Sequence, residues 1–434
     1  MLQNGFRRLK IDGWRQFQSI DIELHPRLTI ITGANGAGKS TLLSFFTRHF
    51  GYHRNYLATP QMRGGITRFT FGLFDSLRKN GWFGRGPAPS DAPQIGEIEY
   101  INGHKSPLRL PRQQGLHYGI NIDSQQSVPG VHIDSHRPPN IYRGVAQFPA
   151  MPPQVNQIGN VLNNEYMTYF SSGQIQQGSL HHIKMTLIQM SIFGHGNSTM
   201  EPVPELLALF GGFEAILKKI LPRSLGFNRL IIRSPEVLLS TKSGDFLIDA
   251  ASGGIIKLFE VAWQLYFFSK TVSDFVITFD EPENHLHPSM QKSFLPSLLE
   301  AFPGCQIIVV THSPFIISAM RDSSVYVLRY ADTELLATDT DDDKSVLGMM
   351  GSRVIAERLD TVNKAGTASE ILRDVLGITT TIPDWAEDRV NSIVAEYRGR
   401  SLDENALKQL YNQLEKEGLI SSYPVAVSAL TRRQ

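Results

Sequence analysis

Short runs of apolar, mostly β-branched residues predict a set of buried strands in this chain. They are Leu28–Ile31, Phe275–Phe279, Cys305–Val310 and Ser324–Tyr330. Runs of this kind are typical of parallel strands that are covered on both faces. The first three end at glycine-rich or polar residues, and open α/β sheets bind their ligands at the carboxyl ends of such strands. The pattern therefore predicts an α/β fold with a parallel-sheet core and a ligand site at one edge.

Other segments show different periods. Gly96–Leu110 alternates around Asn102-Gly103 and predicts a hairpin, and Gly130–Ser135 predicts a strand that ends before two prolines. Leu230–Ala250 predicts one hairpin that turns at residues 242–245. Helical spacing of apolar residues appears in the insert and in the C-terminal part: Ser179–Phe193, Pro204–Leu221, Ala368–Leu376, Trp385–Tyr397 and Asp403–Gly418.

Residues 33–40 read Gly-Ala-Asn-Gly-Ala-Gly-Lys-Ser, with a strand before them and a helix-forming stretch after them. This is the G-x-x-x-x-G-K-[ST] phosphate loop, whose glycines let backbone N–H groups surround a β-phosphate at a helix N-terminus. Lys39 can reach the β- and γ-phosphate oxygens, and Ser40 can offer a hydroxyl to Mg²⁺. We expect ATP and Mg²⁺ as cofactors. The predicted nucleotide-binding residues of this loop are Gly33, Ala34, Asn35, Gly36, Ala37, Gly38, Lys39, Ser40 and Thr41.

Three further features lie downstream in order. Ser252-Gly253-Gly254 opens a long apolar segment and offers a hydroxyl and bare N–H groups, a second anion site. Asp280 and Glu281 follow the next strand, where Asp280 is predicted to hold Mg²⁺ and Glu281 to activate water. His312 follows the strand after that and is predicted to contact the γ-phosphate. Each feature alone also fits an ordinary helix cap, strand cap or loop residue. Because they occur in the same chain as the phosphate loop, the catalytic interpretation is favoured, in which Lys39, Glu281 and His312 act on ATP.

Together these motifs resemble the ABC-type ATPases. The N-terminal residues 6–24 resemble the opening hairpin of the SMC, RecF and OLD group, and Asp280–Pro288 is closest to the OLD-type members. The resemblance implies an ABC-type head with an antiparallel β subdomain and a parallel-sheet core. We assign residues 1–50 and 230–335 to this head, 51–229 to an inserted α+β region and 336–434 to a helical C-terminal docking region.

The resemblance also implies an assembly. In ABC-type proteins the signature of one subunit closes the nucleotide site of another, so Ser252, Gly253 and Gly254 are expected to act in trans. A chain with one copy of each motif is then expected to work at least as a homodimer. Among stand-alone heads, the chain resembles the ATPase subunits of the Septu and PARIS anti-phage systems. That likeness implies a scaffold or sensor that controls a separate nuclease or toxin and responds to a phage trigger.

Composition narrows the alternatives. The 434 residues carry a net charge of +1, which disfavours a protein that coats nucleic acid but leaves a RecF-like DNA-binding repair ATPase as the main alternative. No apolar stretch is long enough to span a membrane, and the single cysteine, Cys305, excludes intrachain disulfides, so a cytoplasmic location is expected. The C-terminal part lacks the carboxylates of an OLD nuclease domain, which predicts no nuclease activity in this chain.

Several residues keep two interpretations. Gln147 and Gln61 are both candidates for a Mg²⁺-binding glutamine, and Arg137 either touches phosphate or makes a structural ion pair. His285 and His287 have the spacing of metal ligands but lack a third one, so an interface role is favoured. The basic and aromatic residues 78–85 and the acidic residues 339–343 are interpreted as solvated loops.

Overall fold

The computed structural model describes residues 4–63, 66–70, 93–111, 115–147, 149–174, 178–331, 353–359, 368–372, 384–398 and 403–431. The chain divides into two compact units, Met1–Gly366 and Thr367–Gln434, which are described separately. The basic cluster at 78–85 and the acidic run at 339–343 lie outside the described residues. None of the helices in the described ranges has the length and apolar character that a membrane span requires.

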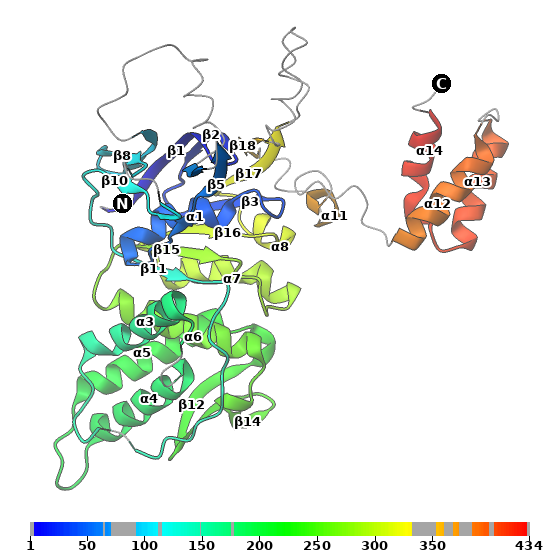
Figure 1. Cartoon of the computed structure of the whole chain (residues 1–434). Helices are drawn as coiled ribbons and strands as arrows, with labels where there is room; N and C mark the ends of the chain where they lie inside the picture. Colours follow the sequence, from blue (N-terminus) through cyan, green and yellow to red (C-terminus); the bar gives the residue numbers. More distant parts are fainter. Residues whose placement is uncertain are drawn as a thin grey trace. The chain divides into compact units, whose positions relative to one another are not determined.

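One long mixed sheet runs through the first unit (Figure 1), in the order β10-β8-β7-β1-β2-β18-β17-β3-β16-β15-β11. Strands β17, β3, β16, β15 and β11 are parallel to one another, while β2, β1, β7, β8 and β10 form antiparallel pairs. The strands are β1 (Phe6–Trp14), β2 (Phe17–Glu23), β3 (Leu28–Gly33), β7 (Gln94–Tyr100), β8 (Lys105–Arg109), β10 (Asn121–Ile122), β11 (Gly130–Ile133), β15 (Phe275–Asp280), β16 (Cys305–Val310), β17 (Ser324–Ala331) and β18 (Arg353–Arg358).

Burial explains this division of the sheet. Every residue of β3 and β16 is buried, as expected for parallel strands covered on both faces, whereas β1 alternates between buried and exposed positions. Helix α1 (Lys39–Thr47) covers β3, β16, β15 and β11 and shares a hydrophobic core with the antiparallel strands. The α/β class, with its parallel core and antiparallel subdomain, is therefore confirmed.

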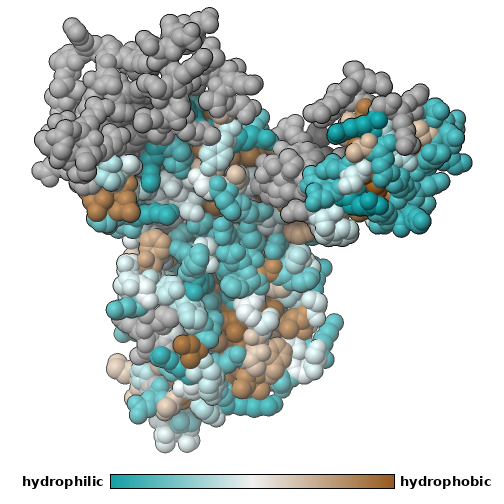
Figure 2. Space-filling model, turned by 45° about the vertical axis from the view of Figure 1, so that its right-hand side comes forward, coloured by the Kyte–Doolittle hydropathy of each residue, from teal (hydrophilic) through white to brown (hydrophobic). Residues whose placement is uncertain are grey.

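The helical part of the first unit lies beyond β11 and β15, in the lower half of Figure 1. Its helices are α3 (Val155–Ser172), α4 (Ser179–His195), α5 (Pro204–Ile220) and α6 (Gly253–Ser269), and α7 (Pro288–Ala301) and α8 (Pro314–Ile317) follow along the chain. Helix α6 is buried along most of its length because α3, α4 and α5 pack around it. In this half Figure 2 shows hydrophobic residues among the hydrophilic ones at the surface.

A small three-stranded sheet precedes α6. It consists of β12 (Phe227–Arg233), β13 (Glu236–Thr241) and β14 (Gly244–Leu247), where the sequence predicted a single hairpin. The predicted turn at 242–245 is present, but Ser234-Pro235 forms an earlier turn that splits the first strand. Two-stranded ribbons pair β4 (Tyr56–Leu57) with β9 (His117–Tyr118) and β5 (Thr59–Arg63) with β6 (Ile66–Thr70).

The second unit contains a helical bundle formed by α12 (Asp384–Tyr397), α13 (Glu404–Lys416) and α14 (Tyr423–Thr431). Its core contains Val390, Ile393, Leu410 and Leu414. The predicted helices at 385–397 and 403–418 match α12 and α13. Of the predicted helix at 368–376, the structure describes α11 (Ala368–Glu370), and residues 373–376 lie outside the described part.

The main sheet crosses the boundaries expected from the sequence. Strand β18 pairs with β17 and β2, although its residues were assigned to a helical C-terminal region. Strands β7, β8 and β11 also belong to this sheet, although their residues were assigned to the insert. The physical reason is that these strands bury apolar side chains against partners distant in sequence, which the local pattern does not reveal.

Candidate nucleotide site

The phosphate loop links β3 to α1 through backbone conformations that favour glycine. Gly33, Gly36 and Gly38 have φ values of +141°, +79° and +93°. A Cβ atom on Gly38 would lie 2.5 Å from Gln16 Nε2 and from Phe17 Cζ, and one on Gly33 would lie 2.4 Å from the carbonyl oxygen of Leu328. The loop is therefore pressed against the sheet on one side, while Ala34, Asn35 and Gly36 are exposed on the other. Its free N–H groups at the start of α1 suit an anion.

Lys39 is a buried cation at the first position of α1. Its side chain is 6% exposed, and Nζ donates to the carbonyl oxygens of Gly33 (3.0 Å) and Ala34 (2.9 Å). Burial lowers the pKa of Lys39 to about 8, against the opposing effect of the carboxylates Glu281, Asp280 and Glu283. A buried ammonium held by two neutral carbonyl groups would form a stronger, charge-assisted hydrogen bond with a phosphate oxygen.

Ser40 and Asp280 supply two oxygen ligands of the type Mg²⁺ prefers. Ser40 Oγ donates to Asp280 Oδ1 at 3.2 Å, which joins the start of α1 to the end of β15. Burial raises the pKa of Asp280, and the hydrogen bond from Ser40 and the nearby His132 act against this shift. Within the described ranges no cluster of three His, Cys, Asp or Glu side chains could hold a metal alone. This donor set fits an ion that is bound jointly with nucleotide phosphates.

Glu281 and His312 face each other at the ends of neighbouring strands β15 and β16. His312 Nε2 lies 3.6 Å from Glu281 Oε1, and about one third of each side chain is exposed (32% and 33%). Glu281 has a positive φ of 48°, which is uncommon for a residue other than glycine and turns the chain sharply after β15. Asn284 Nδ2 donates to Glu281 Oε2 at 3.2 Å. Burial and the charge of Lys39 lower the pKa of His312, while Glu281 raises it.

The signature residues lie apart from this cluster. Ser252 is the N-cap of α6, and both Ser252 and Gly253 are exposed. A Cβ on Gly253 would meet no atom within 4 Å, whereas one on Gly254 would lie 2.6 Å from the carbonyl oxygen of His285. In the part of the chain that the structure describes, no hydrogen bond or ion pair joins Ser252, Gly253 or Gly254 to the phosphate loop.

Of the two roles considered for Arg137, a phosphate contact or a structural ion pair, the structure shows the ion pair. Its guanidinium lies 3.7 Å from Glu260 Oε2, donates to Gln264 Oε1 at 2.9 Å and stacks over Tyr166. Glu260 and Gln264 belong to α6, so Arg137 ties the segment after β11 to the signature helix. Its side chain is only 8% exposed, and its guanidinium group is engaged by these three partners.

The residue that ends the strand beside Asp280 is an aspartate. Ile133 pairs with Phe279, so Asp134 follows β11 next to the end of β15, and its Oδ1 accepts from the N–H of His136 at 2.8 Å. Neither glutamine candidate takes this place, since Gln147 lies in an exposed loop and Gln61 belongs to β5. Sequence reasoning missed Asp134 because it placed this residue inside the strand predicted for Gly130–Ser135, whereas β11 ends at Ile133.

The His pair after Glu281 has separate local roles. His287 caps α7, where its Nδ1 accepts from the N–H of Ser289. The backbone of His285 packs closely against Gly254, with its carbonyl oxygen where a Cβ on Gly254 would clash. The interface role expected for His285 and His287 remains a prediction.

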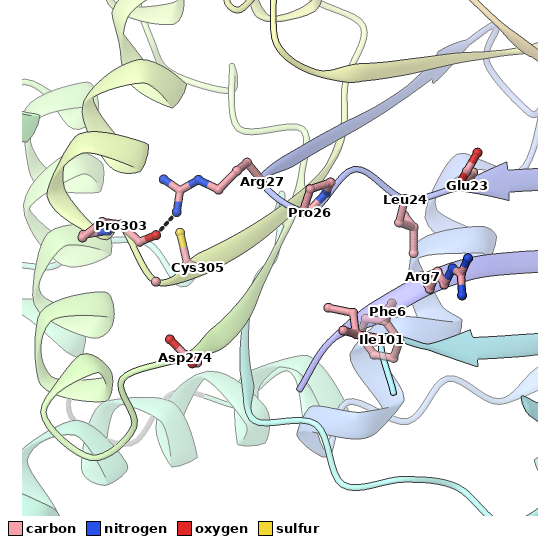
Figure 3. A pocket seen from close by; sticks show the side chains of 11 residues that line it. Phe6, Arg7, Glu23, Leu24, Pro26, Arg27, Ile101, Asp274, Pro303 and Cys305 are labelled. Atoms are coloured by element: carbon pink, nitrogen blue, oxygen red, sulfur yellow. Dashed lines mark hydrogen bonds between the residues drawn. The ribbon is translucent and has the colours of Figure 1, made fainter. Parts of the chain in front are cut away.

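A cavity of about 600 Å³ lies at the opposite ends of β15 and β16 (Figure 3). It is lined by Arg7, Arg27, Asp274 and Cys305 among others. Arg27 donates to the carbonyl oxygen of Pro303, just beyond the end of α7, and to that of Leu299, in its last turn. Arg7 pairs with Glu99 at 3.1 Å. Both cations are therefore engaged in the fold, and this cavity is separate from the residues that the motifs bring together.

Fold and motif geometry together resemble an ABC-type ATPase head of the OLD and SMC group. Two family comparisons agree: a family described as "AAA domain" matches residues 8–67, and one described as "AAA domain, putative AbiEii toxin, Type IV TA system" matches residues 229–318. The first match contains the phosphate loop, and the second contains the signature, Asp280, Glu281 and His312.

Among individual proteins, the chain is similar to the Septu protein PtuA of Bacillus thuringiensis. The two are 22% identical over 95% of this chain and 93% of PtuA. The OLD nuclease of Thermus scotoductus is 24% identical over 82% of this chain and 68% of its own length. A solved SMC head domain from Thermotoga maritima covers 82% of the chain with 12% identity and a TM-score of 0.39. The similarity to PtuA and to the OLD nuclease, together with the two family matches, confirms the resemblance to ATPases of the OLD group and to defence ATPases.

Proposed function

We propose that this chain is a Mg²⁺-dependent ATPase that works as pairs of heads and controls a separate effector protein. One observation carries the ATPase part of the proposal: Lys39 and Ser40 at the start of α1 meet Asp280, Glu281 and His312 at the carboxyl ends of the parallel strands β15 and β16. A phosphate-binding loop, a buried cation, a pair of magnesium ligands and an acid–histidine pair are what phosphoryl transfer to water requires.

In this proposal each group has one task. The N–H groups of the phosphate loop and the Lys39 ammonium hold the β- and γ-phosphates, and Ser40 and Asp280 hold Mg²⁺, which neutralises charge on the phosphate oxygens when bound. Glu281 accepts a proton from the attacking water, and Asn284 orients its carboxylate. His312, opposite Glu281, contacts the γ-phosphate.

The pairing of heads follows from the position of the signature. Ser252 and Gly253 are exposed and have no hydrogen bond to the phosphate loop of their own chain. We infer that they close the nucleotide site of a second copy, so that two ATP molecules are bound between two protomers. Symmetric pairing satisfies both sites at once, because each protomer offers the group that the other lacks.

Control of an effector is supported by the similarity to PtuA over nearly the whole of both chains. The first unit also exposes large hydrophobic side chains near its helical part, among them Ile141 (68%), Met151 (72%) and Val161 (45%), and the helical bundle exposes Trp385 (68%). Exposed apolar side chains of this kind suit a protein partner. We propose that a nuclease or toxin is held here, in defence against phage, and that a phage product triggers its release.

The test measures assembly and chemistry on the purified chain. We expect the molecular mass to double when ATP and Mg²⁺ are added, and the Lys39→Ala variant to stay monomeric and to bind no ATP. Plasmid DNA incubated with the chain and Mg²⁺ or Mn²⁺ should remain intact. A monomer that turns over ATP without a second head would refute the paired site. If the purified chain cleaves the plasmid and the cleavage stops when the metal is removed, the chain has nuclease activity and this part of the proposal is refuted. Tight, salt-dependent DNA binding would favour the repair ATPase instead.

A further inference from the structure

Glu283 lies two residues after the proposed base and holds the strand end that carries His312. Its Oε1 atom accepts three hydrogen bonds: from Thr311 Oγ1 (2.7 Å), from the N–H of His312 (2.7 Å) and from the N–H of Ser313 (3.1 Å). A carboxylate that receives two backbone N–H groups forms strong, charge-assisted bonds. The backbone on both sides of the histidine is therefore fixed by one side chain.

The residues on either side of His312 are also held by other parts of the fold. Thr311 is fully buried, and its carbonyl oxygen accepts from Thr32 Oγ1 at 2.8 Å, which ties it to the strand before the phosphate loop. Ser313 Oγ donates to Gln291 Oε1 at 2.6 Å. Between these two anchors, Glu283 is the side chain that binds the His312 backbone itself.

The same short segment also carries the base. Glu281 bonds Asn284, and the carbonyl of Asn284 accepts from Lys257 Nζ at 3.2 Å, so the segment is attached to the signature helix as well. The imidazole of His312 is 3.6 Å from Glu281, longer than a strong hydrogen bond, so a small shift of the strand end changes whether the two groups engage.

We propose that Glu283 is a positioning residue for ATP hydrolysis, which acts by setting His312 against Glu281 and the γ-phosphate. It makes no contact of its own with the reacting atoms in this arrangement. The inference rests on the proposed ATPase function of the site. It predicts that loss of Glu283 lowers kcat and leaves the affinity for ATP unchanged, because the phosphate loop does not depend on the bond.

The experiment is a double-mutant cycle on the full chain with Glu283→Ala, His312→Ala and the double variant. Misplacing a reacting group by about 1 Å costs on the order of 10²-fold in rate. We expect kcat of Glu283→Ala to fall by up to that factor, and the double variant to be no slower than His312→Ala alone, because both changes remove one function. The dissociation constant of a fluorescent ATP analogue should match that of the wild type for Glu283→Ala, and that of His312→Ala for the double variant.

Two further variants separate positioning from damage to the fold. Glu283→Gln keeps an oxygen that accepts the N–H groups, and we expect kcat within about tenfold of the wild type, since the three hydrogen bonds to this oxygen lose the help of the charge but are retained. Glu300→Ala, on the exposed face of α7, is the matched acidic control and should have wild-type turnover. If Glu283→Ala does not fold, the cycle is run with Glu283→Gln, whose deficit should vanish in the His312→Ala background.

The outcomes distinguish the inference from the function beneath it. Effects that multiply in the double variant, or a weaker affinity for ATP with unchanged kcat, would overturn the positioning role while the wild type still hydrolyses ATP. A wild-type chain that binds ATP but never hydrolyses it, alone or with its partner, would overturn the proposed ATPase function itself.

Discussion

Replacing Glu281 with glutamine tests the proposed base directly. The change removes a charge but keeps the length and branching of the side chain, so the positive φ of 48° and the bond from Asn284 at 3.2 Å are retained. General base catalysis contributes about 10²–10⁴ in rate. Because one third of the Glu281 side chain is exposed (33%), solvent can partly replace it, and we expect a loss in the lower half of that range. A loss of about 10²–10³-fold in kcat corresponds to about 3–4 kcal/mol.

The assay for Glu281→Gln combines phosphate release, binding of a fluorescent ATP analogue and mass measurement with ATP present. We expect slow release, wild-type affinity and a larger fraction of paired heads, since ATP that is not hydrolysed keeps the two protomers together. Glu300→Gln, the same chemical change at an exposed position, should behave as the wild type. Turnover by Glu281→Gln equal to that of the wild type would refute the assignment of the base.

Three other results are expected. Burial lowers the pKa of Lys39 to about 8, so the nucleotide-free protein loses this charge as the pH rises through 8. Above pH 8 we expect ATP to bind more weakly and with uptake of a proton, as calorimetry in buffers of different ionisation enthalpy should show; binding without proton uptake would contradict this. Lys184 is fully buried and lies 2.7 Å from Asp249, so Lys184→Met should lower the free energy of unfolding in urea by about 3 kcal/mol, because it leaves carboxylates unpaired. Gly254→Ala should weaken ATP-dependent pairing but not ATP binding, because its Cβ would press on the carbonyl of His285 at 2.6 Å; unchanged mass would contradict this.

The parallel core and the positions of the motif residues on it could be predicted because their signals are local. An apolar run that ends in Asp280-Glu281 specifies both a buried strand and its functional end, and the glycines of the phosphate loop specify positive φ values. The helices at 385–397 and 403–418 were likewise predictable, since their apolar spacing and terminal residues lie within the segments themselves.

What the sequence could not provide is the pairing of distant segments. Strand β11 lies beside β15 although more than a hundred residues separate them, and that neighbour relation is what brings Asp134 to Asp280. The bonds of Glu283 to the His312 strand end depend on the sharp turn after β15 and have no counterpart in the local pattern. The commitment of Arg137 to Glu260 also requires the packing of α6 to be known.

The place of β3 in the sheet has a consequence for how the chain is made. Its two neighbours, β16 and β17, begin at Cys305 and Ser324, so both of its edges stay unpaired until the ribosome has synthesised most of the polypeptide. An apolar strand with two open edges is prone to aggregate. Expression of a truncated N-terminal fragment that ends before Cys305 should therefore yield insoluble material.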